Sequence, residues 1–198
     1  MVILVVIGIV PSFIVKNVVV NSYETRAVSI REVNLKNQCD ILGNQLMKEN
    51  YLREPDSDVI NGELSMLSAI YNGRILIINK DAKIIKDTYD IDVGKYALSE
   101  EVIQCFEGKS TANYDDKNAY IEMTSPITKM DSNTIEGVML VSISTSEIED
   151  SIDMLENRGN LLLSIICILV LVFGYLLAGV LVKPFSRVTK AIEDLTDG

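Results

Sequence analysis

The sequence predicts an α+β protein in which a long N-terminal helix and a five-stranded antiparallel sheet are flanked by two transmembrane helices. Three observations lead to this prediction. Apolar residues gather at both ends of the chain, in residues 1–20 and 161–182. Between these segments, apolar residues first recur at helical spacing, and short β-rich runs separated by polar turns follow. The length of 198 residues accommodates one ordinary domain in addition to the two apolar segments.

The second apolar segment predicts a transmembrane helix. It reads "LLLSIICILVLVFGYLLAGVLV", which is 22 residues without a charge. As a helix it would be roughly 33 Å long, which matches the hydrocarbon core of a bilayer at about 30 Å. A buried helix of a soluble protein would normally carry a polar stripe. Apart from small residues, this segment offers only Ser164 and Tyr175.

The first apolar segment is shorter, because its uncharged part runs only from Met1 to Val15 and Pro11 interrupts it. A secretory signal peptide is the alternative reading, but the basic start and the small-x-small cleavage site of such a peptide are missing. A helical pattern continues directly from the segment. We therefore predict an N-terminally truncated first transmembrane helix, with Lys16 and Asn17 at its outer interface.

The distribution of charge predicts the orientation. Residues 21–160 hold 14 Lys and Arg against 25 Asp and Glu, a net charge of −11. Three basic residues follow the second apolar segment, at Lys183, Arg187 and Lys190. Because basic residues stay on the cytoplasmic side, we expect a multi-pass protein of the cell membrane with residues 21–160 extracytoplasmic and the C-terminus cytoplasmic. An acidic outer segment also argues against nucleic acid as a partner.

The chain contains no histidine, which excludes histidine-based catalysis and most zinc sites. Asp115, Asp116 and Glu122 could suggest calcium, but a single acidic turn is more typical of solvated surface. Cys39 and Cys105 could form a disulfide, yet each also lies on an apolar helix face, as buried free thiols do. We expect no catalytic residue, metal or cofactor within these residues.

The outer segment predicts alternating helices and strands. A helix over residues 21–54 carries an apolar stripe and should end at Pro55. The stripe consists of Val28, Leu35, Cys39, Leu42 and Leu46. A second helix begins at Asp56 and Ser57, ends near Tyr71 and is closed by Gly73.

The strands come next. A hairpin pairs residues 75–78 with 84–85, and a helix follows from Ser99 to Gly108. Two strands surround the Asp-Asp-Lys-Asn turn of residues 115–118. In "TIEGVMLVSIST" the run Val138–Val141 is apolar on both faces, which predicts a central strand covered on both sides. A helix capped at Ser146 then leads into the second apolar segment.

The last stretch, "KPFSRVTKAIEDLTDG", has the pattern of a parallel coiled coil. Phe185, Val188, Ile192 and Leu195 are spaced three, four and three, between Pro184 and Gly198. This stretch resembles the first helix of a HAMP domain, the coiled-coil relay that follows the last span of many bacterial receptors. The alternative is a generic amphipathic helix next to the membrane.

The whole chain resembles the N-terminal half of a bacterial membrane sensor histidine kinase, with an outer segment similar to a single Cache domain, a PAS-like fold. The HAMP-like stretch and the hairpin "GRILIINKDAKII" carry the local resemblance. The domains would be 1–20 (first transmembrane helix), 21–158 (sensor), 161–182 (second transmembrane helix) and 183–198 (HAMP).

This resemblance implies a homodimer in the membrane and a kinase domain beyond residue 198. That domain would use ATP and Mg²⁺ to phosphorylate a histidine and would pass the phosphoryl group to a response regulator. A chemoreceptor or a diguanylate cyclase with the same sensor is an alternative. A non-signalling membrane protein with a PAS-like outer domain is another.

Cache-like domains bind small molecules over one face of the sheet. Tyr120, Glu122 and Thr124 share one face of a predicted strand, while Arg74 and Tyr89 flank the first hairpin. A guanidinium, tyrosine hydroxyls and a carboxylate could hold an amino acid or a small acid. The alternatives are an ordinary polar sheet face, a surface pair of Arg74 with Glu122, and a sensor for an envelope component. A signal would cross the bilayer as a small rigid-body shift of the flanking helices.

Overall fold

The computed structural model describes residues 2–129, 134–177 and 179–180. The chain divides into two compact units, one made of Met1–Glu24 with Ser151–Gly198 and the other of Thr25–Asp150. Two helices, α1 (Val2–Lys48) and α4 (Ser146–Leu177), contribute to both units. The unit of residues 25–150 is called the sheet domain below.

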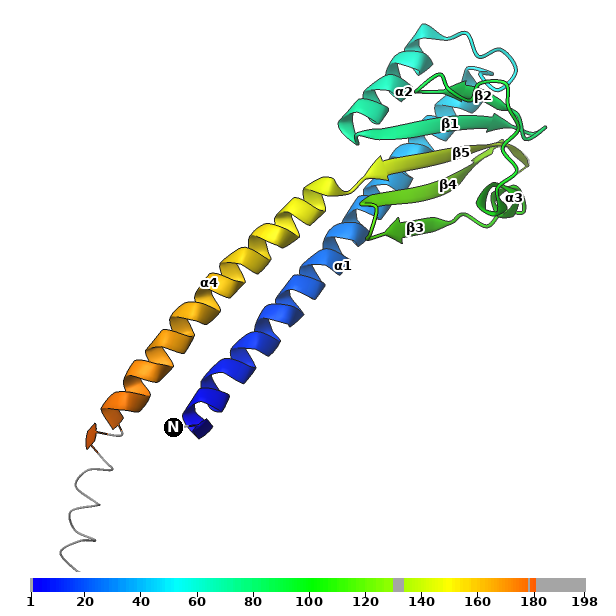
Figure 1. Ribbon diagram of the computed structural model, residues 1–198. Helices are drawn as coiled ribbons and strands as arrows, with labels where there is room; N and C mark the ends of the chain where they lie inside the picture. The colour runs from blue at the N-terminus through cyan, green and yellow to red at the C-terminus, as the bar shows by residue number, and fades with distance from the viewer. Residues whose placement is uncertain (1, 130–133, 178, 181–198) are drawn as a thin grey trace, which may run out of the picture. The chain divides into compact units, whose positions relative to one another are not determined.

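The sheet domain contains five antiparallel strands in the order β2-β1-β5-β4-β3 (Figure 1). The strands are β1 (Gly73–Asn79), β2 (Ile84–Asp87), β3 (Ala112–Asp115), β4 (Tyr120–Thr128) and β5 (Ile135–Ser144). The predicted α+β class, with its five-stranded antiparallel sheet and long N-terminal helix, is confirmed. The strand predicted to be central, β5, is central.

The sheet has an apolar layer on each face because β5 is apolar at successive positions. Met139 and Val141 point to one face and Val138 to the other, and all three are fully buried. Val138 pairs with Ile78 of β1, and Val141 pairs with Ile75. Helices must therefore cover both faces of the sheet, and Figure 1 shows α1 passing behind the sheet and α3 in front of it.

Helix α1 buries the predicted stripe, because Val28, Leu35, Cys39, Leu42 and Leu46 are all buried. Its end differs from the prediction: α1 stops at Lys48, before Pro55. Asn50 adopts a left-handed conformation, with φ of 56°, and the amide of Tyr51 donates to the carbonyl of Leu46 at 2.9 Å. This hydrogen bond caps the helix about six residues before the point at which Pro55 would end it.

Helix α2 (Asp58–Ile70) starts as predicted, with the Ser57 side chain accepting a hydrogen bond from the amide of Ile60. Gly73, however, does not close it. Asn72 takes the left-handed position, with φ of 44°, and Gly73 begins β1. A side chain at Gly73 would place its Cβ 2.5 Å from the Ser142 carbonyl oxygen, so the glycine is required by close strand packing.

Helix α3 (Glu100–Phe106) covers part of the face opposite α1. Its Val102 and Cys105 are fully buried in an apolar cluster. The other buried members are Leu76, Ile78, Ile84 and Val138. Gly108, with φ of 90°, follows the helix as predicted.

The three cysteines are free thiols. Cys39 is buried on α1 and Cys105 is buried on α3, so the sheet separates them. Of the two alternatives that the sequence leaves open, the structure therefore has buried free thiols and no disulfide between Cys39 and Cys105.

In the unit formed by the chain ends, α4 carries the candidate membrane span. Its most apolar window has a mean hydropathy of 2.7, and only 6% of that window is buried. Over the described residues, α4 is the single helix long and apolar enough to cross a bilayer. The first transmembrane helix, over residues 1–20, therefore stays a prediction.

Candidate ligand-binding face

Polar side chains form a row across the sheet face that α3 partly covers. Arg74 of β1 lies opposite Ser142 of β5, which lies opposite Glu122 of β4, and Glu122 lies opposite Asn113 of β3. Directly opposed residues point to the same face of a sheet. The Ser142 hydroxyl donates to a Glu122 carboxylate oxygen at 3.2 Å.

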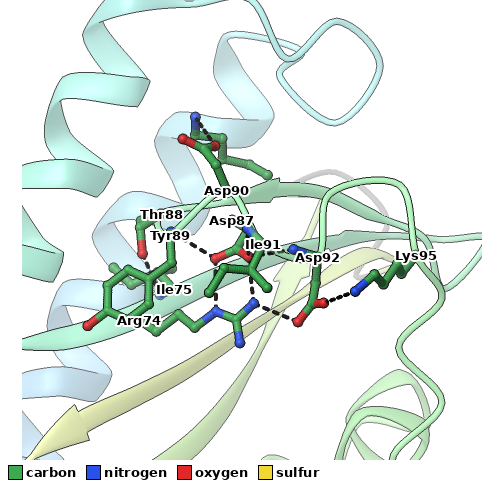
Figure 2. Close-up of polar contacts among 10 residues, drawn as sticks. Arg74, Ile75, Asp87, Thr88, Tyr89, Asp90, Ile91, Asp92 and Lys95 are labelled. Carbon is green, nitrogen blue, oxygen red and sulfur yellow. Dashed lines mark hydrogen bonds and ion pairs between the residues drawn. The ribbon is translucent and has the colours of Figure 1, made fainter.

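At one end of this row, Arg74 forms a charged network with two aspartates (Figure 2). Its Nε donates to Asp87 Oδ1 at 2.9 Å, and its Nη2 donates to Asp87 Oδ2 at 2.5 Å and to Asp92 Oδ2 at 2.6 Å. The Asp87 side chain is fully buried, whereas Arg74 keeps 26% of its side chain exposed. The network extends to solvent through an ion pair of Asp92 with Lys95.

Asp87 also holds the loop that follows β2. Its carboxylate accepts hydrogen bonds from the backbone amides of Tyr89, Ile91 and Asp92, each at 2.9 Å. Burial raises the pKa of Asp87, but the Arg74 guanidinium and these three amides outweigh burial and hold the pKa well below its usual range. The hydrogen bonds to Asp87 and Asp92, together with the charges of the two carboxylates, raise the pKa of Arg74. Asp87 is therefore ionised at neutral pH and organises this loop.

At the other end of the row lies a hollow of about 470 Å³. It is lined by Glu101 of α3 and by Asn113, Tyr114, Asp115, Asp116, Lys117, Tyr120 and Glu122. Four of these residues are carboxylates and one is a lysine, so the hollow is acidic. The charge of Asp115 raises the pKa of the Tyr120 hydroxyl, with smaller contributions from desolvation and Glu122. We call this feature the acidic hollow.

Asp115 is occupied by its own turn. Its side chain accepts hydrogen bonds from the amides of Lys117 and Asn118 at 3.0 and 3.1 Å, and from the Asn118 side chain at 2.8 Å. These contacts lower the pKa of Asp115. Within the described part of the chain, no group of three or more His, Cys, Asp or Glu residues is arranged to hold a metal ion.

The five residues predicted to bind a ligand fall into three places. Tyr120 and Glu122 line the acidic hollow. Arg74 belongs to the aspartate network, and its guanidinium carbon lies 5.9 Å from the ring centre of Tyr89. Thr124 is buried, with its hydroxyl 2.9 Å from that of Thr111.

The surface pair of Arg74 with Glu122 is not formed, because β5 lies between their strands and Arg74 faces Asp87. Sequence reasoning missed Asp87 and Asp92. One feature of the sequence could have indicated them. The stretch "KDTYDIDVGK" holds three aspartates, and closely spaced aspartates are typical of turns in which side chains accept hydrogen bonds from the backbone.

A second contact joins the first and last helices of the sheet domain. Arg31 of α1 forms an ion pair with Glu147, in the first turn of α4, at 3.3 Å. The guanidinium carbon of Arg31 also lies 5.0 Å from the ring centre of Tyr71, just after α2. The contact links the helix that enters the sheet to the helix that leaves it. The predicted relay residues Pro184, Phe185, Val188, Ile192, Leu195 and Gly198 lie outside the described residues.

No protein-family model matches the sequence. A search of curated proteins also gives no match. Solved structures with a similar fold include the sensor domain of the V. cholerae histidine kinase DctB, with 14% identity and a TM-score of 0.45 over 68% of this chain and 59% of that chain. They also include the ligand-binding domain of the Campylobacter jejuni chemoreceptor Tlp3 in complex with L-valine, with 14% identity and a TM-score of 0.44 over 67% of this chain and 60% of that chain. The chain thus spans about three fifths of the length of these sensor domains.

Proposed function

We propose that this chain is the sensing input region of a membrane-bound sensor histidine kinase. The sheet domain would lie outside the cell membrane, and its first and last helices would carry a conformational signal through the bilayer. A HAMP coiled coil and a kinase domain beyond residue 198 would receive it. The protein would act as a homodimer and would phosphorylate a response regulator.

The observation that carries this proposal is the continuity of α4. Helix α4 begins at Ser146, buries Ile148 in the sheet domain and continues without a break into the apolar run as far as Leu177. A helix that belongs to the sheet domain at its start and to a candidate membrane span at its end suits a receptor, because such a helix could carry a movement at the sheet toward the bilayer. The HAMP-like pattern that follows in the sequence favours a signalling receptor over a membrane protein without an output.

Phosphorylation of the full-length gene product tests the kinase assignment. Membranes containing it are incubated with radiolabelled ATP and Mg²⁺, and the protein-bound phosphate is tested for acid lability. We expect an acid-labile phosphoryl group, as a phosphohistidine would give. Methyl transfer to glutamates or synthesis of a cyclic dinucleotide would instead indicate the chemoreceptor or the cyclase alternative.

The acidic hollow is the proposed sensing site. Glu101, Asp116 and Glu122 give it negative charge, while Arg74 is held by Asp87 and Asp92. An ammonium group is therefore favoured over a free carboxylate. Of the two ligand classes that the sequence suggests, this favours an amino acid or another amine over a small acid.

A thermal-shift screen of amines, amino acids and carboxylic acids against the full chain tests this site. We expect an ammonium-bearing compound to raise the melting temperature, and Glu122→Gln or Tyr120→Phe to remove most of that rise. Asp81→Asn is the matched control, because it neutralises a carboxylate in the turn between β1 and β2. Stabilisation by a small acid that survives Glu122→Gln would contradict the proposal.

A further inference from the structure

We propose that the unit formed by the chain ends binds one anionic phospholipid, with an acyl chain in a groove between α1 and α4 and the headgroup phosphate at Lys16 and Arg158. This inference rests on the proposed placement of both helices in a membrane. It adds a specific lipid site to that placement.

The groove lies within one unit of the structure and has a volume of about 460 Å³. This volume is in the range of ligand pockets, about 300–1,000 Å³. Apolar side chains from both helices form most of its lining. They are Pro11, Val15, Val19 and Val20 of α1 and Leu155, Leu162, Leu163 and Ile166 of α4.

Two cations also line the groove, at Lys16 and Arg158, and none of the residues that line it is acidic. The Lys16 ammonium donates to the Asn160 side-chain oxygen at 2.7 Å, which uses one of its three N–H groups. Over the described residues, Arg158 has no ion pair with a carboxylate. Its guanidinium offers a planar fork that matches a phosphate.

The cations lie where a phosphate layer would be. Lys16 directly follows the uncharged run that ends at Val15, and Arg158 comes three residues before the run that begins at Leu161. Long basic side chains at such positions extend to the headgroup level. The apolar lining residues within the two uncharged runs lie on the hydrocarbon side of the cations, where an acyl chain would be: Pro11, Val15, Leu162, Leu163 and Ile166. The chain as a whole carries a net charge of −10. The groove differs from this average, because two basic residues and no acidic residue line it.

A phospholipid fits this lining better than two other occupants. A free phosphate ion would use the cations but would leave the apolar walls without a partner. A helix from a second copy of the chain could fill the apolar walls, but a symmetric copy would bring its own Lys16 and Arg158 toward the same place. Like charges at close range disfavour that arrangement.

The test uses the full chain reconstituted in phosphatidylcholine vesicles that contain trace spin-labelled phosphatidylglycerol or, separately, spin-labelled phosphatidylcholine. The measured quantity is the selectivity, which is the ratio of the motionally restricted fractions of the two labelled lipids. We expect phosphatidylglycerol to be preferred.

Each basic residue near an anionic headgroup contributes about a fivefold preference. The Lys16→Gln/Arg158→Gln variant should therefore lose most of the selectivity, and Arg158→Lys should lose less than Arg158→Gln.

Two further variants separate a built site from a diffuse layer of charge. Lys36→Gln/Lys129→Gln removes the same two charges from exposed positions of the sheet domain and should keep the selectivity. Ile166→Trp would fill the acyl-chain part of the groove without changing the charge, and it should lower the selectivity. Selectivity that survives Ile166→Trp, or that falls equally in the Lys36/Lys129 variant, overturns the proposal.

The remaining outcomes are distinguishable. If the chain co-floats with the vesicles in a density gradient but shows no preference for phosphatidylglycerol, the lipid site is overturned and the proposed function stays in place. A chain that does not enter vesicles overturns both. Efficient disulfide crosslinking between copies through Ile166→Cys, in a Cys167→Ser background, would place a second copy in the groove and would also overturn the lipid site.

Discussion

At the scale of single residues, Asp87 is a tightly constrained polar group of the sheet domain. It is fully buried, and its two oxygens accept hydrogen bonds from Arg74 and from three backbone amides. A buried carboxylate is tolerated only when its charge is balanced and its oxygens are satisfied. The residue that the sequence singled out as a ligand contact, Arg74, supplies that balance.

Asp87→Asn should therefore be strongly destabilising. The amide leaves Arg74 without its main partner and turns one acceptor into a donor that faces backbone amides. We expect a loss of about 3 kcal/mol in the free energy of unfolding, measured by urea denaturation of the full chain in detergent. Asp90→Asn is the control, because Asp90 is 77% exposed and its ion pair with Lys86 is long, at 3.6 Å. Equal stability losses in the two variants would contradict this role of Asp87.

The depressed pKa of Asp87 also predicts a pH dependence. A carboxyl whose folded-state pKa lies below its unfolded value of about 4 stabilises the fold fully above that value. This stabilisation is lost as the pH falls toward the folded-state pKa. Melting temperatures measured between pH 7 and pH 2 should fall below about pH 4, and the gap between wild type and Asp87→Asn should narrow there. A gap that widens on acidification would show the opposite sign.

At the scale of elements, helix and strand positions could be predicted from the sequence, while their ends and their polar contacts could not. Periodicity places α1 and the strands because burial selects one face of each. The ends of α1 and α2 depend on Asn50 and Asn72, and asparagine adopts a left-handed conformation only where the following chain requires it. Tyr120 and Glu122 could be placed together by their alternation on one strand. The pairing of Arg74 with Asp92 depends on a loop fold that carries no periodic signal.

The two layers of the sheet also predict how its cysteines react. Cys39 and Cys105 are buried on opposite sides, and burial, with a smaller contribution from Asp40, raises the pKa of Cys39 to about 12. At pH 8 only about one Cys39 thiol in ten thousand would then be ionised. In a Cys167→Ser variant in detergent, we expect almost no reaction with a thiol reagent until denaturant is added, and two thiols afterwards. Rapid labelling of the folded protein would show that one of the layers opens.

At the scale of the whole molecule, the proposed signal must pass between the helix that enters the sheet domain and the helix that leaves it. The Arg31–Glu147 ion pair joins them directly. Glu147 is 79% exposed, so the pair contributes at most about 1 kcal/mol to stability. Its proposed importance therefore lies in fixing the first turn of α4 against α1 and not in holding the fold together.

A double-mutant cycle tests this coupling. The amides of Ile148 and Glu149 both donate to the Thr145 carbonyl, so their hydrogen exchange reports the first turn of α4. Arg31→Gln and Glu147→Gln should each speed that exchange by up to about fivefold, in proportion to the free energy of the pair. Exchange in the double variant should be no faster than in the faster single variant, because the interaction can be lost only once.

The control is Arg26→Gln, which removes an exposed charge one turn earlier on α1 and should leave the exchange rates of these amides unchanged. Additive effects of Arg31→Gln and Glu147→Gln would mean that the two residues act separately, and this contact would then not couple α1 to α4.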